Sequence, residues 1–324
     1  MSPAAADDVV HTTARPRVTL GILGSMVWDL IEHPEGPVVE RWGGISYSLA
    51  AAAVALPDGW RIRPVVKLGE DLAAPAHAFM AGIPGLDLGP GLATTPEPNN
   101  RVRLRYVDRH NRHESLTGGV PPWTWEELEP RLDGIDALYV NLISGFELDL
   151  PTARRLRRSR RGLLYADFHS LLLDRGDGDR RPRPLADREA WLACFDVVQV
   201  NEDELALVAG QDPPLPFARA AVQAGLGAFL ITRGPAGAIR IARSGGSAAW
   251  EAAGDVEITT VPAEGEESLA DPTGCGDVWG ATCFVRLVVG DALDDAVRVA
   301  SRAAARNLRH RGADGLYHHL KGEA

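Results

Sequence analysis

The sequence predicts an α/β fold built on an open, mostly parallel sheet with helices on both faces. After Pro121, short apolar runs alternate with helical segments, which is the pattern of parallel strands joined by crossover helices. The predicted strands of this region are 137–142, 162–166, 197–200 and 228–232, and the predicted helices are 125–132, 151–158, 187–194, 202–209 and 218–224. The regular alternation predicts a sheet that is covered on both sides.

The segments before and after this region extend the same fold. An apolar run from Val18 ends at Gly24 and predicts a buried first strand, while 46–56 predicts an alanine-rich helix and 63–68 another strand. Two more helices are expected near 276–289 and 294–309. The first of these carries one buried face, formed by Val278, Ala281, Val285 and Val288.

Two segments depart from the alternation of strands and helices. From Arg101 to Val107, apolar and charged residues alternate, which predicts a half-exposed antiparallel strand. Residues 180–184 lie in a stretch rich in Gly, Asp and Pro without periodicity, and we expect a mobile insertion there. We expect residues 1–16 to be a disordered leader and 17–324 to be a single domain.

Composition and charge exclude several classes of protein. Thirty-four Lys and Arg against 44 Asp and Glu leave a formal net charge of −10, which argues against general binding to nucleic acid or anionic lipid. The longest apolar stretches are far shorter than the roughly 20 residues that a membrane helix needs. We therefore expect neither a membrane nor a nucleic acid as a partner.

Lysine and cysteine are both scarce. Lys67 and Lys321 are the only lysines, and neither stands in the G-x-x-x-x-G-K-[ST] context of a P-loop. A phosphate site must therefore use backbone amides, arginines and a metal ion. The three cysteines, Cys194, Cys275 and Cys283, form no C-x-x-C pair, so neither a disulfide scaffold nor a thiolate zinc site is supported. Together with the absence of a signal-peptide pattern, this predicts a cytoplasmic protein.

The clearest chemical signal is the segment Asp271-Pro-Thr-Gly-Cys-Gly-Asp277, directly before the periodic helix. Gly274 and Gly276 let successive amides converge at the helix N-terminus, whose partial positive charge attracts anions. Asp277 stands in the first turn, where a carboxylate beside an anion hole can accept a proton from an attacking hydroxyl. Taken alone, the segment is explained equally well as a glycine-rich turn with an acidic first helical turn.

This segment resembles the Gly-Ala-Gly-Asp signature of the ribokinase-like family of carbohydrate and nucleoside kinases. Five further motifs precede it in the chain, in the order in which the family has them. They are Gly24-Ser-Met-Val-Trp-Asp29, Trp42-Gly43-Gly44, Val66-Lys-Leu-Gly69-Glu-Asp71, Asn201-Glu202-Asp203-Glu204 and Thr232-Arg-Gly234-Pro-Ala-Gly237. The resemblance covers nearly the whole chain from Val18. It implies that Asp29 binds substrate hydroxyls and that Gly43 and Gly44 let the substrate approach the backbone.

The resemblance also implies a nucleotide site with Mg²⁺. Asn201 and Glu204 follow a predicted strand at the carboxyl edge of the sheet, where ligands of open α/β sheets bind. Oxygen ligands suit Mg²⁺, and we expect Glu204 to bind it through water; a helix start with an acidic first turn is the alternative. Thr232, Gly234 and Gly237 are expected to line the ATP site, or else to form an ordinary turn. Asp29 is expected to end a strand.

A small β-sheet lid is implied as well, with strands from about 31–45 and 101–117. A lid excludes water from the site, and it can pair with a second lid in a homodimer. A monovalent cation, K⁺, is implied near Asp271 and the loop at Gly312.

The departures from the family pattern concern the acceptor. Ser48 stands where the family often has an asparagine, and Ile143 aligns with a glutamate that lines the sugar site in some ribokinases. The typical ribose contacts are therefore not all kept, whereas the phosphate machinery is. Cys275 replaces the usual alanine and is expected to act as a small residue, with a reactive thiol as the alternative.

These observations predict an ATP-dependent kinase that phosphorylates a hydroxyl of a small sugar or related polyol. Asp277 is the expected general base, and the amides of Gly274, Cys275 and Gly276 form the expected anion hole. A nucleoside kinase is the first alternative, in which Trp42, Tyr47 and Tyr106 stack on a base or else simply pack. A non-catalytic sugar or nucleotide sensor is the second. An oxidoreductase is disfavoured because no G-x-G-x-x-G follows the first strand.

Overall fold

The main sheet of the computed structural model has nine strands among the residues that the structure describes, which are 18–32, 37–107, 112–175, 178–245, 254–263 and 272–323. The predicted leader, 1–16, lies outside these residues. The strands, in sheet order, are β13 (Val256–Val261), β12 (Ala238–Arg243), β11 (Ala228–Thr232), β10 (Val197–Asn201), β9 (Leu164–Asp167), β8 (Ala137–Asn141), β1 (Thr19–Leu23), β4 (Arg61–Gly69) and β5 (Leu92–Thr95). All neighbours from β11 to β5 are parallel, whereas β12 and β13 are antiparallel.

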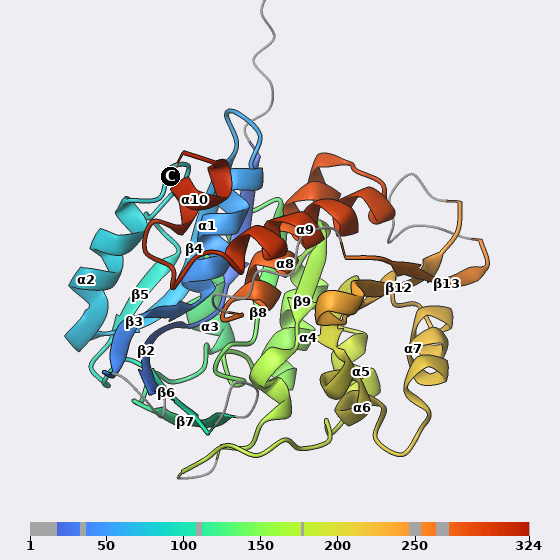
Figure 1. Cartoon of the computed structure of the whole chain (residues 1–324), viewed down its shortest axis with the longest axis horizontal. Helices are drawn as coiled ribbons and strands as arrows, with labels where there is room; N and C mark the ends of the chain where they lie inside the picture. Colours follow the sequence, from blue (N-terminus) through green and yellow to red (C-terminus); the bar gives the residue numbers. More distant parts are fainter. Residues whose placement is uncertain are drawn as a thin grey trace, which may run out of the picture.

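Helices cover both faces of this sheet (Figure 1), which confirms the predicted fold class. One face packs on α1 (Ile45–Ala55), α2 (Glu70–Ala81), α8 (Cys275–Val289), α9 (Leu293–Asn307) and α10 (Leu316–Lys321). The other packs on α3 (Trp125–Leu128), η1 (Glu129–Leu132), α4 (Leu150–Ser159), η2 (His169–Leu172), α5 (Arg188–Leu192), α6 (Glu202–Ala209) and α7 (Pro214–Gln223). Because both faces are covered, a central strand such as β8 is buried along its whole length.

The order of the strands fixes where a ligand site can form. The chain leaves β1 for β4 on one side and later returns to β8 on the other side. This change of direction opens a crevice at the carboxyl ends of β1 and β8, which is where open α/β sheets bind ligands. Asn141, Asp167, Asn201 and Thr232 are the last residues of β8, β9, β10 and β11.

A separate small sheet has four strands in the order β3 (Val39–Gly44), β2 (Met26–Glu32), β6 (Arg101–Tyr106) and β7 (Arg112–Thr117). In β6, Val102 and Leu104 are buried and Arg103 and Arg105 are exposed, as the alternation predicts. β6 is antiparallel to β7 and parallel to β2.

Two expectations are wrong in this region of the fold. Asp29 does not end a strand: it lies inside β2, paired with Arg41 and Val102, because the chain begins a second strand directly after the bend at Gly24. Residues 178–184, called the strap below, are held by bridges from Asp179 to Ser115 and from Pro182 to Leu173 instead of forming a mobile insertion. Pairing with distant segments leaves no periodic signal in the strap itself.

Lys67 is enclosed between β4 and the start of α3. Its Nζ pairs with Glu127 Oε2 at 2.8 Å, donates to Pro122 O at 3.0 Å and lies 4.7 Å from the centre of the Trp123 ring. A buried ammonium needs such partners to offset its lost hydration. Lys67 therefore has a structural role in holding the start of α3 against β4.

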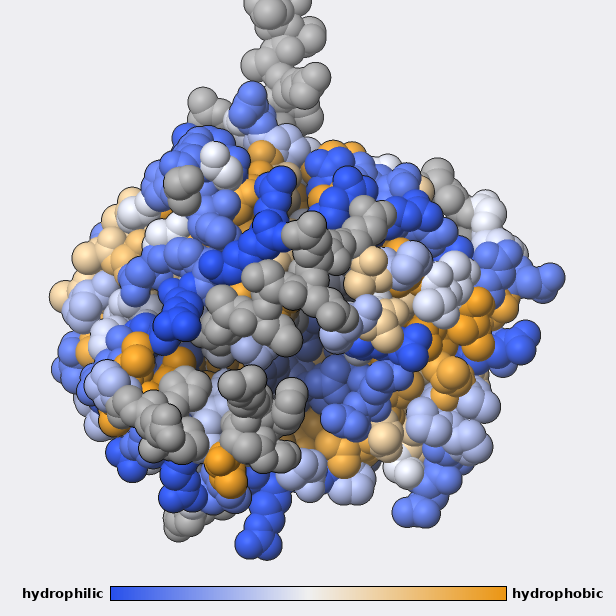
Figure 2. Space-filling view, viewed as in Figure 1, coloured by the Kyte–Doolittle hydropathy of each residue, from blue (hydrophilic) through white to orange (hydrophobic). Residues whose placement is uncertain are grey.

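On the face of the molecule drawn in Figure 2, hydrophilic residues predominate. Figure 2 shows apolar residues in small separate groups on the face drawn there. None of the helices formed by the described residues has the length and apolar character needed to cross a membrane.

Candidate active site

A cavity of about 470 Å³ lies between the small sheet and the carboxyl edge of the main sheet. Eight of the predicted site residues line it: Asp29, Gly44, Asn201, Glu204, Thr232, Gly274, Gly276 and Asp277. Five do not line it: Gly43, Ser48, Cys275, Gly234 and Gly237. Five of the six sequence motifs therefore contribute residues to one cavity, whereas the motif from Val66 to Asp71 contributes none.

Asp277 stands in the first turn of α8, and its side chain is buried at the cavity wall. Its Oδ1 accepts a hydrogen bond from Nδ2 of Asn141 at 2.6 Å, and the same nitrogen donates to Ser48 Oγ at 3.2 Å. A short bond to a charged acceptor is among the stronger hydrogen bonds in proteins. Asn141 therefore fixes the direction of the Asp277 carboxylate, and Ser48 supports Asn141.

Two glycines, Gly274 and Gly276, stand at the start of α8, and the backbone requires glycine only at the first of them. Gly274 has φ of +75°, and a Cβ there would lie 2.2 Å from the ring of Tyr47, so only glycine fits. At Gly276 a Cβ would meet no atom within 4 Å, and this position faces the cavity.

The Cys275 amide donates to Pro272 O at 3.2 Å within the turn. Its thiol lies beside Asn307, whose Nδ2 is 3.3 Å from Sγ. The Cys275 thiol thus points away from the cavity, and its amide is already engaged within the turn.

Asp29 reaches the cavity from the small sheet. Its carboxylate is buried and packs directly over Gly43, where a Cβ would lie 1.9 Å from Oδ2. Gly44, with φ of +60°, follows at the end of β3 and lines the cavity. The absence of a side chain at Gly43 thus leaves room for the Asp29 carboxylate, which explains why glycine is needed at this position.

Asn201 and Glu204 form a capping box at the start of α6. Asn201 Oδ1 accepts from the Glu204 amide at 2.8 Å, and Glu204 Oε2 accepts from the Asn201 amide at 2.7 Å. Both side chains also line the cavity. The helix-start interpretation and a role at the site are therefore compatible, because the capping box holds Glu204 at the cavity wall.

Asp167 was not recognised from the sequence, although it ends β9 at the same edge as Asn141 and Asn201. Its Oδ2 accepts from Nε2 of Gln199 at 2.8 Å, and it lines the cavity. Burial, with the nearby charges of Glu204 and Asp277, raises the pKa of Asp167 well above its usual range. Burial also raises the pKa of Glu204. The strand-end rule that identified Asn201 would also have found Asp167.

These acidic groups fit Mg²⁺ held together with phosphate oxygens. Asp167, Glu204 and Asp277 crowd negative charge into one buried place, which a divalent cation would relieve. Within the described ranges, no group of three or more His, Cys, Asp or Glu side chains is arranged to hold an ion alone. Mg²⁺ usually binds through one or two carboxylates, waters and substrate phosphates, so the donor set suits it.

Thr232 ends β11 at the cavity, where its hydroxyl donates to Val200 O at 3.5 Å. Gly234 begins a short 3₁₀ helix, η3 (Gly234–Ala236), with φ of +53°. At Gly237, a Cβ would lie 2.2 Å from Val261 O. The two glycines are thus explained by the turn itself, and Thr232 is the residue of this motif that reaches the cavity.

The remaining predicted residues lie elsewhere. Asp271 is outside the described residues. Gly312 lies against the side chain of Arg41, and a Cβ added at Gly312 would be 2.8 Å from Arg41 Cδ. Of the aromatic residues proposed to stack on a base, Tyr47 lines the cavity, whereas Trp42 packs edge-on against Trp28 with ring centroids 4.9 Å apart.

Comparison with solved structures shows the same fold across most of the chain. A pyrophosphate-dependent kinase of the ribokinase family has a TM-score of 0.73 at 18% identity, covering 90% of this chain and 96% of its own. A nucleoside kinase from Burkholderia thailandensis in complex with inosine has a TM-score of 0.71 at 21% identity, covering 93% and 94%. An E. coli ribokinase II in complex with ATP and Mg²⁺ has a TM-score of 0.72 at 16% identity, covering 94% and 98%.

The chain thus shares the fold of these ribokinase-family structures, which confirms the ribokinase-like fold that the sequence resemblance implies. Residues 177–319 match the model of the pfkB family of carbohydrate kinases. No curated protein matches the sequence.

Proposed function

We propose that the protein is an ATP-dependent kinase that phosphorylates a hydroxyl of a small sugar or related polyol. The observation that carries the proposal is the buried Asp277 carboxylate at the N-terminus of α8, held by Asn141 and facing the same cavity as Asp29. This arrangement offers a proton acceptor, an anion-binding helix end and a hydroxyl-binding carboxylate around one space.

In the proposed reaction, an acceptor hydroxyl oxygen attacks the γ-phosphorus of ATP. Its proton passes to the Asp277 carboxylate, an O–P bond forms, and the bond between the γ-phosphorus and the β,γ-bridging oxygen breaks to release ADP. The amides at the start of α8, those of Gly274 and Gly276 foremost, stabilise charge on the transferring phosphoryl group.

Asp29 and Gly44 hold the acceptor, and Asn201, Glu204 and Thr232 lie on the donor side of the cavity. When bound near Asp167 and Glu204, Mg²⁺ supplies positive charge that neutralises the triphosphate. A structure of the same fold contains ATP and Mg²⁺, which supports ATP as the donor.

A panel of acceptors with Mg-ATP tests this function. Wild-type protein and Asp277→Asn are incubated with sugars, cyclitols and nucleosides, and ADP release is measured. Asp295→Asn is the matched control, because Asp295 is an exposed aspartate in the first turn of α9 and lies outside the cavity. We expect release that requires an acceptor and falls by roughly 10²–10⁴-fold in Asp277→Asn only.

Each alternative has its own outcome in this panel. Turnover of nucleosides alone would establish a nucleoside kinase, for which Tyr47 at the cavity offers a ring. Acceptor or nucleotide binding without turnover would establish a sensor. Equal turnover in wild type and Asp277→Asn would exclude Asp277 as the base. Pyrophosphate in place of ATP is included as a donor, since a structure of this fold is named as pyrophosphate-dependent.

Three further parts of the proposal concern the setting of the enzyme. K⁺ is proposed as an activator and is tested by replacing KCl with tetramethylammonium chloride in the assay.

A homodimer through the small sheet is proposed at β3, beside the half-exposed Val38, and is tested by light scattering. A cytoplasmic location is supported by the three cysteines, all of which carry free thiols.

A further inference from the structure

The strap joins the small sheet to the main body beside the cavity. On one side, the Arg180 amide donates to Glu114 O at 2.7 Å and Asp179 bridges to Ser115 of β7. On the other side, the Arg183 amide donates to Leu172 O at 2.8 Å, next to η2. The strap therefore continues the small sheet beyond β7 and ties its edge to the loop that follows β9.

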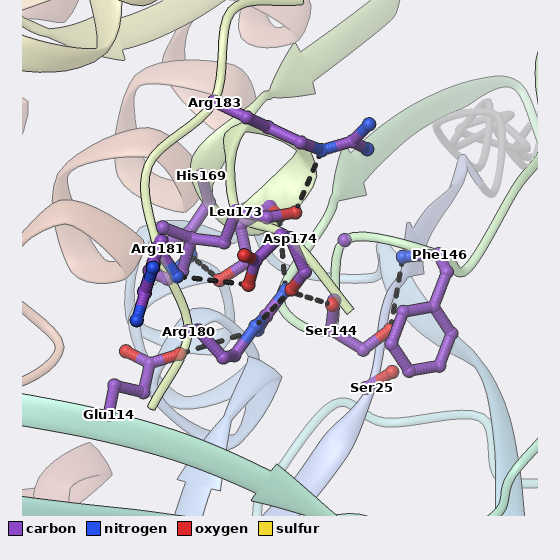
Figure 3. A network of polar contacts seen from close by, with 12 residues as sticks. Ser25, Glu114, Ser144, Phe146, His169, Leu173, Asp174, Arg180, Arg181 and Arg183 are labelled. Carbon is purple, nitrogen blue, oxygen red and sulfur yellow. Dashed lines mark hydrogen bonds and ion pairs between the residues drawn. The ribbon is translucent and has the colours of Figure 1, made fainter. Parts of the chain in front are cut away.

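Arg180 places a buried guanidinium at the centre of this junction. Only 2% of its side chain is exposed, and it donates to Ser144 O at 2.9 Å, Asp174 O at 3.1 Å and Ser170 O at 3.3 Å. Its fourth partner is Glu114 Oε1 at 3.3 Å. Figure 3 shows Glu114 beside this guanidinium, while Arg183 points away from it. A buried charge with so many partners holds a fixed position, and it holds Glu114 with it.

Glu114 and Asp29 point to the same face of the small sheet. Asp29 of β2 pairs with Val102 of β6. Two residues further along β6, Leu104 pairs with Ile31 on one side and with Glu114 of β7 on the other. Paired residues share a face, and so do residues two apart on one strand. The backbone positions of Asp29 and Glu114 are two strand spacings apart, about 10 Å, and are also offset by two residues along the strands, about 7 Å, with Val102 and Leu104 between them. All four side chains line the cavity.

The charge of the cavity wall restricts what can bind there. Six carboxylates line it, those of Asp29, Glu114, Asp167, Asp203, Glu204 and Asp277, and His169 lies among them. In the part of the chain that the structure describes, no lysine or arginine lines it. A phosphorylated or acidic acceptor would face these carboxylates without a cation to receive it. Arg180 does not serve this purpose, because it is engaged behind Glu114.

We infer that Glu114 binds hydroxyl groups of an uncharged polyol acceptor, opposite Asp29, and that Arg180 is its positioning residue. A carboxylate accepts hydrogen bonds from vicinal hydroxyls, and the apolar surface between the two carboxylates suits the carbon face of such a molecule. This inference rests on the proposed kinase function. It gives the site a second acidic contact, which comes from β7. This contact replaces the glutamate that some ribokinases have at the position of Ile143.

Steady-state kinetics of four variants test the inference. The acceptor probes are myo-inositol, D-ribose and inosine, with D-ribose 5-phosphate and D-gluconate as anionic counterparts. The variants are Glu114→Gln, Arg180→Met, Arg180→Lys and the matched control Glu32→Gln. Glu32 is also a glutamate of the small sheet paired with an arginine, Arg103 at 3.4 Å, but it lies outside the cavity.

We expect wild type to prefer an uncharged acceptor. Glu114→Gln should raise the acceptor KM at least tenfold while kcat changes less than threefold and the ATP KM is unchanged. Arg180→Met should do the same, Arg180→Lys should restore part of the affinity, and Glu32→Gln should behave as wild type. An unchanged acceptor KM in Glu114→Gln overturns the inference and leaves the kinase function standing. Preference for an anionic acceptor overturns the class of acceptor.

A binding readout separates the inference from the proposed function. If wild type turns over none of the probes, the shift in Tm that each probe causes is compared between wild type and Glu114→Gln. A probe that stabilises wild type and not Glu114→Gln supports the inference without catalysis, and equal stabilisation of both overturns it. A wild type that is neither active with nor stabilised by any probe overturns both. Because Glu114→Gln keeps size and shape, the test does not depend on whether Arg180→Met folds.

Discussion

Asn141 donates a hydrogen bond of 2.6 Å from Nδ2 to Oδ1 of Asp277, across 136 residues of sequence. It joins the carboxyl end of β8, a strand at the crevice of the main sheet, to the first turn of α8. The proposed base therefore takes its direction from the sheet and from its own helix together. Such positioning by a neighbouring rigid element is what catalysis by a carboxylate requires.

Asn141→Ala should lower kcat about 10- to 100-fold, because a hydrogen bond to a charged group contributes about 1.5–3 kcal/mol. Ser48→Ala removes only the second and longer partner of Asn141, at 3.2 Å, and should cost less. Both variants are compared by kcat and by thermal unfolding. A folded Asn141→Ala with wild-type kcat would show that Asp277 does not need this partner.

Gly274→Ala and Gly276→Ala should separate stability from activity within one motif. At Gly274, the left-handed backbone alone costs about 1–3 kcal/mol, and the Cβ would also displace the buried ring of Tyr47. At Gly276, a Cβ meets no atom within 4 Å and alanine favours the helix, so the free energy of unfolding should not fall. Activity should fall in both, because Gly276 faces the cavity.

Urea unfolding and kinetics on the same samples check this pair. A Gly276→Ala variant with full activity would exclude the turn as an anion hole. Destabilisation of Gly276→Ala as large as that of Gly274→Ala would contradict the geometry of the turn.

Gly43→Ala should weaken acceptor binding and leave ATP binding unchanged. The new Cβ would lie 1.9 Å from Asp29 Oδ2, so the carboxylate must move away from its place in the cavity wall. We expect the acceptor KM to rise at least tenfold. Gly89→Ala is the control, because its Cβ would be 3.4 Å from Asp87 Oδ1, an ordinary contact. An ATP KM that rises as much as the acceptor KM would contradict a local effect at Asp29.

Alkylation with iodoacetamide should modify Cys275 before the other two thiols. Cys194 and Cys283 are buried, and burial raises the pKa of Cys194 and raises that of Cys283 to about 12. Both thiols therefore stay protonated and weakly nucleophilic at neutral pH. Cys275 is partly exposed and points away from the cavity, so its alkylation and the Cys275→Ala change should leave most activity. Peptide mass spectrometry with a parallel assay measures both, and first labelling of Cys283 would contradict the burial.

The layout of the main sheet was predictable because its signals are local. The buried strand β8 and the mostly buried strand β10 read as short apolar runs. The period of three and four located α8, but the expectation of a single buried face is wrong, because every residue from Asp277 to Val285 is buried. The motifs at Asn201 and Asp277 were predictable for a related reason, since each lies on a strand end or helix start that the sequence marks.

What the sequence could not predict depends on contacts between distant segments. Asp29 was expected to end a strand, whereas pairing with β3 and β6 carries the strand past it. Glu114 and Arg180 are 66 residues apart and come from a strand and a loop that show no common pattern. Only the fold places Arg180 behind Glu114 at the cavity wall.

The enclosure of Lys67 leaves the protein with unusual surface chemistry. Its ammonium is held against Glu127 and Trp123, whereas Lys321, the other lysine, is half exposed on α10. Amine-reactive reagents will therefore modify a single lysine side chain, and that residue lies outside the cavity. Once the α-amino group of the chain is blocked, the protein can thus be attached to a bead or a dye at Lys321, with the cavity left open.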